Sequence, residues 1–148
     1  MQRGVFIDTW GWLAIGHRKD PFHKEVKAYY QKLRHDNSLI VTSDFVLDET
    51  ITLLFKREIF EEAIRFMDGI FEAAEAGYLR IEKITGERFS SAWKLRKRFK
   101  DKPDISFTDI TSMAVMQEGE IKQIITKDEH FTHVGMGYQF VPEVLSQK

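Results

Sequence analysis

The residues Gly4-Val5-Phe6-Ile7-Asp8-Thr9 decide how the rest of the chain is interpreted. A short apolar run that follows a glycine is typical of a buried β-strand. This run ends in a carboxylate and a hydroxyl. Because ligands of open α/β sheets bind outside the carboxyl ends of the strands, Asp8 is a candidate site residue. The alternative is that Asp8 only caps the following helix, since Asp is a favoured N-cap residue. This stretch alone does not decide between the two.

The composition indicates one globular domain that spans residues 1–148. Of these residues, 43% are hydrophobic and 30% are charged, and none is a cysteine, which excludes disulfides and thiolate metal sites and favours a cytoplasmic location. We expect no signal peptide and no membrane span, because no stretch approaches the ~20 apolar residues that cross a bilayer. The net charge of −1 means that a nucleic-acid ligand would need a local basic patch.

Short apolar runs alternate with amphipathic segments along the whole chain. The expected strands are residues 4–9, 38–42, 78–84, 123–126 and 138–141, and the expected helices are residues 10–15, 22–33, 43–57, 60–76, 85–99 and 106–119. Two helix caps remain open, between Ser43 and Asp44 and between Ser106 and Thr108. Such alternation is typical of right-handed βαβ crossovers. It predicts a three-layer α/β/α fold with a central parallel sheet of four to five strands.

Acid and hydroxyl side chains follow three of the expected strands, and these strand ends lie along one edge of a parallel sheet. They are Asp8 and Thr9, then Thr42, Ser43 and Asp44, and finally Thr126 and Asp128. Two helix starts add acids that could face the same edge, namely Asp109 and either Asp48 or Glu49. Helical periodicity does not choose between Asp48 and Glu49.

Several carboxylates within a few ångströms of one another need a counter-charge. At an effective dielectric constant near 20, each close pair of like charges costs about 4 kcal/mol, so either some acids are protonated or a cation is bound. Oxygen ligands without cysteine favour Mg²⁺ or Mn²⁺ over Zn²⁺. A pair of such ions clamps a phosphodiester and lowers the pKa of an attacking water. The acids therefore predict hydrolysis of a nucleic-acid backbone, unless they are unconnected helix caps and surface residues.

Four motifs occur in a fixed order along the chain. They are Phe6-Ile7-Asp8-Thr9, then Thr42-Ser43 followed by Val46-Leu47-Asp48-Glu49, then Ser106-Phe107-Thr108-Asp109, and then Ile125-Thr126-Lys127-Asp128-Glu129-His130-Phe131. In this order and spacing, the chain resembles PIN-domain ribonucleases along its whole length. It looks most like the toxins of VapBC-type toxin–antitoxin pairs.

The resemblance implies an endoribonuclease that depends on Mg²⁺ or Mn²⁺. Its catalytic and metal-binding acids would be Asp8, Glu49, Asp109 and Asp128, which selects Glu49 over Asp48. The supporting residues would be Asp104 (with Asp101 the less favoured choice) and the hydroxyl residues Thr9, Ser43 and Thr126, which hold the acids or a bound water. With Asp8 assigned to the metal, capping of the following helix is left to Thr9.

The resemblance also implies partners: an RNA substrate, a cognate antitoxin protein and a second copy of the chain in a homodimer. Residues 60–71 are rich in bulky apolar side chains, and in such toxins this region and the preceding helix meet the antitoxin or the second copy. PIN domains outside toxin pairs share the same acids, so the motifs alone do not prove the toxin role.

A basic run leads into the loop before Asp109. It comprises Lys94, Arg96, Lys97, Arg98, Lys100 and Lys102. The run is either a solvated helix face or a track for RNA phosphates, since Lys and Arg contacts dominate nucleic-acid affinity. In the second case the RNA-binding residues would be Lys94, Lys97, Arg98 and Lys100.

Three further side chains are expected to have structural roles. His130 is expected to be a structural partner rather than a metal ligand, because the neighbouring Phe131 packs the turn. Trp10 and Trp12 could stack an unpaired base, but they are expected to fill the core or a dimer face.

Two rival functions remain. One is a PIN-fold module that binds RNA or protein without cleavage, and metal-dependent cleavage of RNA would exclude it. The other is a phosphotransfer enzyme of the haloacid-dehalogenase kind, which also begins with an Asp after a strand. That chemistry needs a second Asp two residues later, where this chain has Trp10.

Overall fold

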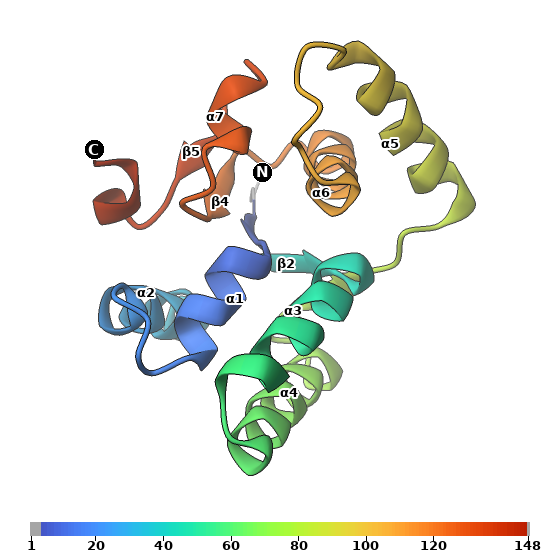
Figure 1. Ribbon diagram of the computed structural model, residues 1–148. Coiled ribbons are helices and arrows are strands. Elements are labelled where there is room, and N and C mark those ends of the chain that lie inside the picture. Colours follow the sequence, from blue (N-terminus) through green and yellow to red (C-terminus); the bar gives the residue numbers. More distant parts are fainter. Residues whose placement is uncertain (1–3, 148) are drawn as a thin grey trace.

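A five-stranded sheet with the strand order β3-β2-β1-β4-β5 forms the centre of the protein, and all four neighbouring pairs are parallel. The computed structural model describes residues 4–147 (Figure 1), so the expected domain limits at residues 1 and 148 lie outside it. The strands are β1 (Val5–Ile7), β2 (Ile40–Ser43), β3 (Arg80–Glu82), β4 (Gln123–Ile125) and β5 (Gln139–Phe140). The helices are α1 (Thr9–Gly16), α2 (His23–His35), α3 (Asp44–Arg57), α4 (Phe60–Glu75), α5 (Gly86–Arg98), α6 (Phe107–Glu118), α7 (His130–His133) and the 3₁₀ helix η1 (Glu143–Ser146).

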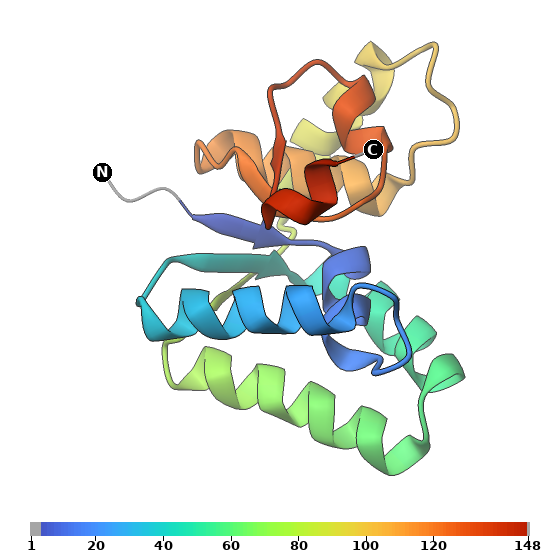
Figure 2. The same ribbon diagram turned by 90° about the vertical axis from the view of Figure 1, so that its left-hand side faces the viewer.

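Helices cover both faces of this sheet. Figure 2 shows α2 and α4 on one side of β1 and β2, and α5 and α6 on the other side. The predicted three-layer α/β/α fold is therefore confirmed, with five strands. None of the helices within residues 4–147 is long and apolar enough to span a membrane.

The central strand β1 is buried on both faces. Phe6 and Ile7 have no exposed surface, and β1 pairs with β2 on one side and β4 on the other, which is why its sequence is continuously apolar. Trp12 of α1 is also fully buried. Its Nε1 donates to Thr42 Oγ1 at 2.9 Å, and that hydroxyl donates to the carbonyl oxygen of Ile7 at 2.8 Å. The prediction that Trp12 fills the core is therefore confirmed.

The helix caps settle three assignments. Asp8 is the N-cap of α1, and its Oδ1 accepts a hydrogen bond from Gly11 N at 2.9 Å. The expectation that Thr9 caps this helix is wrong, because Thr9 is the first helical residue and its side chain makes no cap bond there. Ser43 caps α3 and Ser106 caps α6, each accepting from the amide three residues later.

Helix α1 approaches the sheet most closely at Gly11. A Cβ atom there would lie 2.5 Å from Ile125 O and 2.9 Å from Ile7 Cγ2. We expect Gly11→Ala to lower the free energy of unfolding by about 2 kcal/mol, because the helix must move off the sheet. Urea denaturation measures this change. The matched control is Gly69→Ala in α4, where nothing lies within 4 Å of the added Cβ. There the higher helix propensity of Ala should raise the free energy of unfolding by up to about 1 kcal/mol. Equal effects of the two substitutions would contradict this account.

Candidate active site and metal centre

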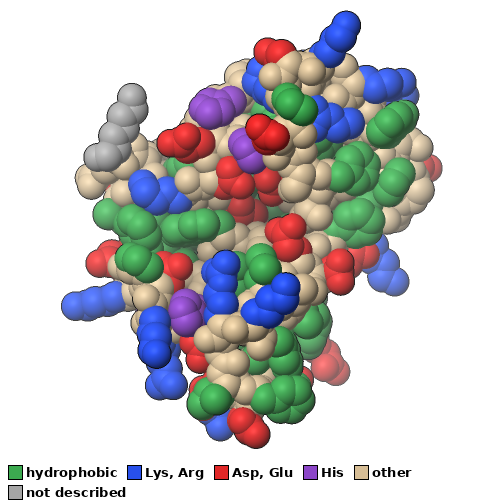
Figure 3. All heavy atoms as spheres, viewed as in Figure 1, with side chains coloured by type: hydrophobic (Ala, Val, Ile, Leu, Met, Phe, Trp, Pro, Cys, Tyr) green, Lys and Arg blue, Asp and Glu red, His purple; other side chains and the backbone are tan. Residues whose placement is uncertain are grey.

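The four predicted acids come from four separate segments and meet at one edge of the sheet. Asp8 follows β1, Asp128 follows β4, Asp109 lies in the first turn of α6 and Glu49 lies in α3. All four line a single cavity of about 350 Å³. Figure 3 shows acidic side chains gathered in a hollow at the centre of one face of the molecule.

The same cavity tests the supporting residues. It is also lined by Thr9, Trp10, Leu13, Asp20, Leu53, Arg57, Asp104, Ser106 and His130. Thr9 and Asp104 line the same cavity as the acids, whereas Asp101 lines a neighbouring cavity to which Asp104 also belongs; the supporting roles of Thr9 and Asp104 stay a prediction. Ser43 is buried and caps α3, so its hydroxyl serves the helix rather than the cavity wall.

Glu49 rather than Asp48 faces the acids. Glu49 is half-buried in the cavity wall, and its charge acts on Asp109. Asp48 is exposed and does not line the cavity. The fold therefore supports the choice that helical periodicity left open.

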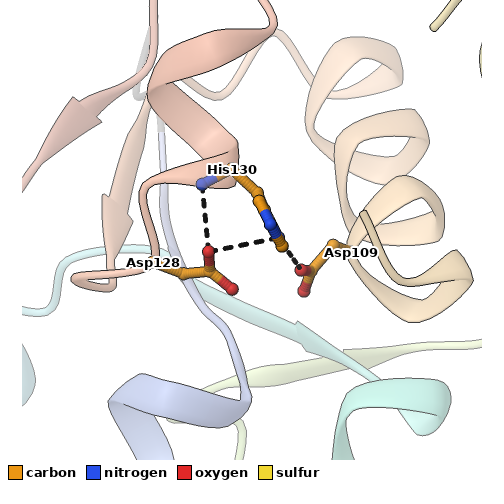
Figure 4. A group of neighbouring side chains, drawn as sticks. All are labelled: Asp109, Asp128 and His130. Atoms are coloured by element: carbon orange, nitrogen blue, oxygen red, sulfur yellow. Dashed lines mark hydrogen bonds and ion pairs between the residues drawn. The ribbon is translucent and has the colours of Figure 1, made fainter. Parts of the chain in front are cut away.

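Asp109, Asp128 and His130 form the closest group in the cavity (Figure 4). His130 Nδ1 lies 3.3 Å from Asp128 Oδ1 and 3.7 Å from Asp109 Oδ2, and the backbone amide of His130 donates to Asp128 Oδ1 at 3.0 Å. Among the described residues, this buried Nδ1 has no partner with hydrogen-bond geometry. His130 thus points between two carboxylates, so its expected role as a structural partner stays a prediction beside that of a metal ligand; Phe131 packs the turn, as expected, with 1% exposure.

Burial raises the pKa of two of these acids. The pKa of Asp8 lies well above its ordinary value of 3.8, mainly because the side chain is buried and then because of the negative charge of Asp109. The pKa of Asp109 rises to about 7, first through burial and then through the charges of Asp128 and Glu49. Near neutral pH the raised pKa values therefore favour protonation of part of this set, and a bound cation would favour the charged carboxylates.

Thr126 joins two of the acids at the end of β4. Its hydroxyl oxygen accepts from Asp128 N at 3.0 Å. The Thr126 side chain also hydrogen-bonds to Asp8, which opposes the rise in the pKa of that carboxyl. Thr126 is fully buried and does not line the cavity itself, so its hydroxyl contacts the two acidic residues from beneath the cavity surface. This arrangement supports the expectation that a small hydroxyl residue here holds the acids.

The donor set fits a divalent cation. One ligand atom from each of Asp109, Asp128 and His130 can be chosen so that all three lie within 4.8 Å of one another, close enough to share one ion. The buried His130 Nδ1, which makes no hydrogen bond of good geometry among the described residues, and the raised pKa values both fit a group of side chains able to bind a cation. Carboxylates suit Mg²⁺ and Mn²⁺, and an imidazole ligand shifts the preference toward Mn²⁺ or a later transition metal.

Two cavity residues, Arg57 and His130, were not predicted to line the site, although local sequence spacing is consistent with their positions. Arg57 follows Glu49 and Leu53 at four-residue spacing, so the three share one face of α3. His130 stands two residues after Asp128, the spacing at which an Asp side chain accepts from a following amide. Trp10, predicted to pack, does contact Phe22 at a ring-centroid distance of 5.8 Å, but it also lines the cavity.

The basic run divides into two groups. The Arg96 guanidinium donates to the carbonyl oxygens of Phe99, Lys102 and Ile105, and Lys102 pairs with Asp101. The Arg96 side chain therefore holds the loop that leads to α6, and the Lys102 ammonium pairs with its sequence neighbour. Lys94, Lys97, Arg98 and Lys100 are exposed, and within the described part of the chain none of them forms an ion pair. RNA binding by these four stays a prediction.

Apolar side chains are exposed at the start of α4, as the apolar sequence of this segment suggested. Ile59 is 64% exposed and Phe60 is 63% exposed. The Phe60 ring contacts Phe55 of α3 at 5.4 Å between centroids. Contacts of this region with an antitoxin or a second copy stay a prediction.

The fold is that of a known family. The chain belongs to the PIN-domain family, whose model matches residues 5–136, so the predicted resemblance is confirmed. The chain is 30% identical over 136 residues to the 23S rRNA-specific endonuclease VapC20 from two strains of Mycobacterium tuberculosis, which covers 88% of this chain and 94% of the relative. The crystal structure of Mycobacterium tuberculosis VapC20, a toxin that cleaves the sarcin–ricin loop, matches with a TM-score of 0.73 and 29% identity, over 89% of this chain and 95% of that one.

Proposed function

We propose that this protein is a metal-dependent endoribonuclease and the toxin of a toxin–antitoxin pair. The observation that carries the proposal is the cavity in which Asp8, Glu49, Asp109 and Asp128 converge. The similarity to VapC20 along almost the whole chain supports it. Because that relative is specific for 23S rRNA, an exposed loop of ribosomal RNA is the first substrate to test. A cognate antitoxin, a homodimer and a cytoplasmic location belong to the same proposal.

In this proposal Asp109, Asp128 and His130 hold a divalent cation, Mg²⁺ or Mn²⁺, with Asp8 and Glu49 completing the acidic wall. The cation would lower the pKa of a water molecule and neutralise charge on the scissile phosphate. Gly11 N and the Thr126 hydroxyl orient the Asp8 carboxylate. The apolar side chains of Leu13 and Leu53 line the same cavity and keep part of its wall dry, which strengthens electrostatic interactions with the substrate.

The test is cleavage of a mixed RNA pool and of intact ribosomes by the purified chain, with Mg²⁺, with Mn²⁺ or with EDTA. New RNA ends that appear with metal and vanish with EDTA are expected. RNA binding without new ends under every metal condition would contradict the proposal and favour the PIN-fold binding module instead.

Arg57 is the cationic residue of the cavity wall, and we expect it to contact the phosphate of the bound substrate. Arg57→Gln is expected to lower kcat/KM for RNA cleavage roughly 10-fold, because one charge-assisted contact to a phosphate is lost. The matched control is Lys56→Gln, the neighbouring exposed cation that does not line the cavity. Steady-state cleavage of a labelled RNA measures both. An equal loss in the two variants would show a general effect of surface charge instead.

A further inference from the structure

Three aromatic side chains lie together at the junction of α5 and α6, outside the acidic cavity. Phe89 and Trp93 are one helical turn apart on α5, and Phe107 begins α6. The Phe89 and Phe107 rings are 5.0 Å apart between centroids and tilted by 57°. With Ser90, the three rings line a hollow of about 510 Å³.

Two of these rings are open to solvent, and the third, Phe107, is half-buried. Trp93 is 54% exposed and Phe89 is 48% exposed, an unusual position for two large aromatic side chains on one helix face. Figure 3 shows hydrophobic side chains over α5 on the same face of the molecule as the acidic hollow.

Basic residues continue directly from the aromatic hollow. Lys97 follows Trp93 by one helical turn, and Phe107 also lines a second hollow of about 540 Å³ together with Arg96, Lys97 and Lys100. Because Arg96 is committed to backbone carbonyls, Lys97 and Lys100 are the cations of this hollow available to a ligand.

The same loop joins this surface to the acids. Phe107 lines both hollows of the surface, and the residue before it, Ser106, lines the acidic cavity with Asp104. A nucleic-acid strand that lies across Phe107 would therefore be next to the wall of the acidic cavity.

The geometry points to an aromatic–basic face, formed by Phe89, Trp93, Phe107, Lys97 and Lys100, that binds single-stranded RNA beside the cleavage site. Unpaired bases stack on Trp93 and Phe89, and Lys97 and Lys100 contact the neighbouring phosphates. Alternating aromatic and basic side chains are how proteins hold single strands without reading base edges. The inference rests on the proposed nuclease function, because it supplies the substrate to that site.

The test measures binding of a short unstructured oligoribonucleotide to the full chain in EDTA, where cleavage does not interfere. Trp93→Ala is expected to weaken binding about 10-fold or more, the loss typical of one stacked base. Trp93→Phe should keep most of the affinity but reduce the quenching of tryptophan fluorescence by RNA, with Trp10 and Trp12 as the remaining tryptophans. The double variant Lys97→Gln/Lys100→Gln should reduce the slope of log affinity against log salt by about 1.4, since each phosphate contact to a single strand contributes about 0.7.

Tyr78→Ala is the matched control. Tyr78 is an aromatic residue of similar exposure, 48%, and it lines neither of the two hollows nor the acidic cavity, so its loss should leave RNA affinity unchanged. Wild-type affinity in Trp93→Ala, or no RNA binding by the wild type, would overturn the inference. Sedimentation gives a third outcome: if Trp93→Ala converts a dimer to a monomer at unchanged RNA affinity, the face binds a second copy and the inference is overturned. If the wild type binds RNA through this face but never cleaves it, the proposed nuclease function is wrong and the RNA-binding face still stands.

Discussion

Asp109→Asn is expected to lower kcat/KM for metal-dependent RNA cleavage by roughly 100- to 1,000-fold. A ligand atom of this carboxylate lies close enough to ligand atoms of Asp128 and His130 for the three to share an ion, and a divalent ion bound there would contribute several kcal/mol to the stabilisation of charge in such reactions. An amide of the same shape keeps the packing but binds the ion weakly. Cleavage of a labelled RNA at saturating Mg²⁺ or Mn²⁺ measures the loss.

The same substitution should make the metal-free protein more stable at neutral pH. Burial and neighbouring charges raise the pKa of Asp109, so removing its charge relieves repulsion that the folded state carries. An activity loss together with a stability gain separates a functional acid from a structural one. Asp48→Asn is the matched control, because Asp48 is exposed and does not line the cavity. Full cleavage by Asp109→Asn, or loss of activity in Asp48→Asn of the same size, would refute the assignment.

The second large effect is a pH-dependent stabilisation by metal. The pKa of Asp109 is about 7 in the folded protein and 3.8 for an ordinary Asp. Between those pH values the folded, metal-free protein binds a proton that the unfolded chain has released, so stability falls as pH rises from about 4 to about 7. A difference of about three pH units corresponds to on the order of 4 kcal/mol. The raised pKa of Asp8 acts in the same direction.

A cation should restore this lost stability, because it favours the charged carboxylates. We therefore expect Mn²⁺ or Mg²⁺ to raise the melting temperature strongly at pH 8 and little at pH 5, where protons compete with the ion. Thermal unfolding with metal and with EDTA at both pH values measures this. In Asp109→Asn the difference between the two pH values should shrink. A metal effect of equal size at pH 5 and pH 8 would contradict the acid cluster as the binding site.

The sequence predicted the order of strands and helices well because each element carries its own local signal. The apolar run before Asp8 and the cap residues Ser43 and Ser106 mark their elements without reference to the rest of the chain. The strand ends were predicted less accurately, since apolar runs continue past the last paired residue. The expected strand over residues 78–84, for example, pairs only over Arg80–Glu82.

The acids of the site were predictable because a parallel sheet brings its carboxyl ends to one edge. The roles of Asp8 and Thr9 were not, because backbone dihedral angles rather than residue type decide which of two adjacent polar residues becomes the cap. His130 and Arg57 were missed for a different reason. Local spacing places Arg57 on the helix face of Glu49 and His130 two residues after Asp128, but their contribution depends on how α3 and the turn after β4 face one another across the cavity, which spacing alone does not give.

Asp8 both caps α1 and lines the acidic cavity, and this has a consequence for how the protein could lose its activity. Asn caps a helix as well as Asp does, so Asp8→Asn should preserve the hydrogen bond from Gly11 and the fold while removing one charge from the cavity. This single substitution would then yield a folded but inactive protein. If the chain pairs with an antitoxin, the inactive variant would still bind that antitoxin. One substitution could therefore convert a toxin into a protein that only sequesters the antitoxin.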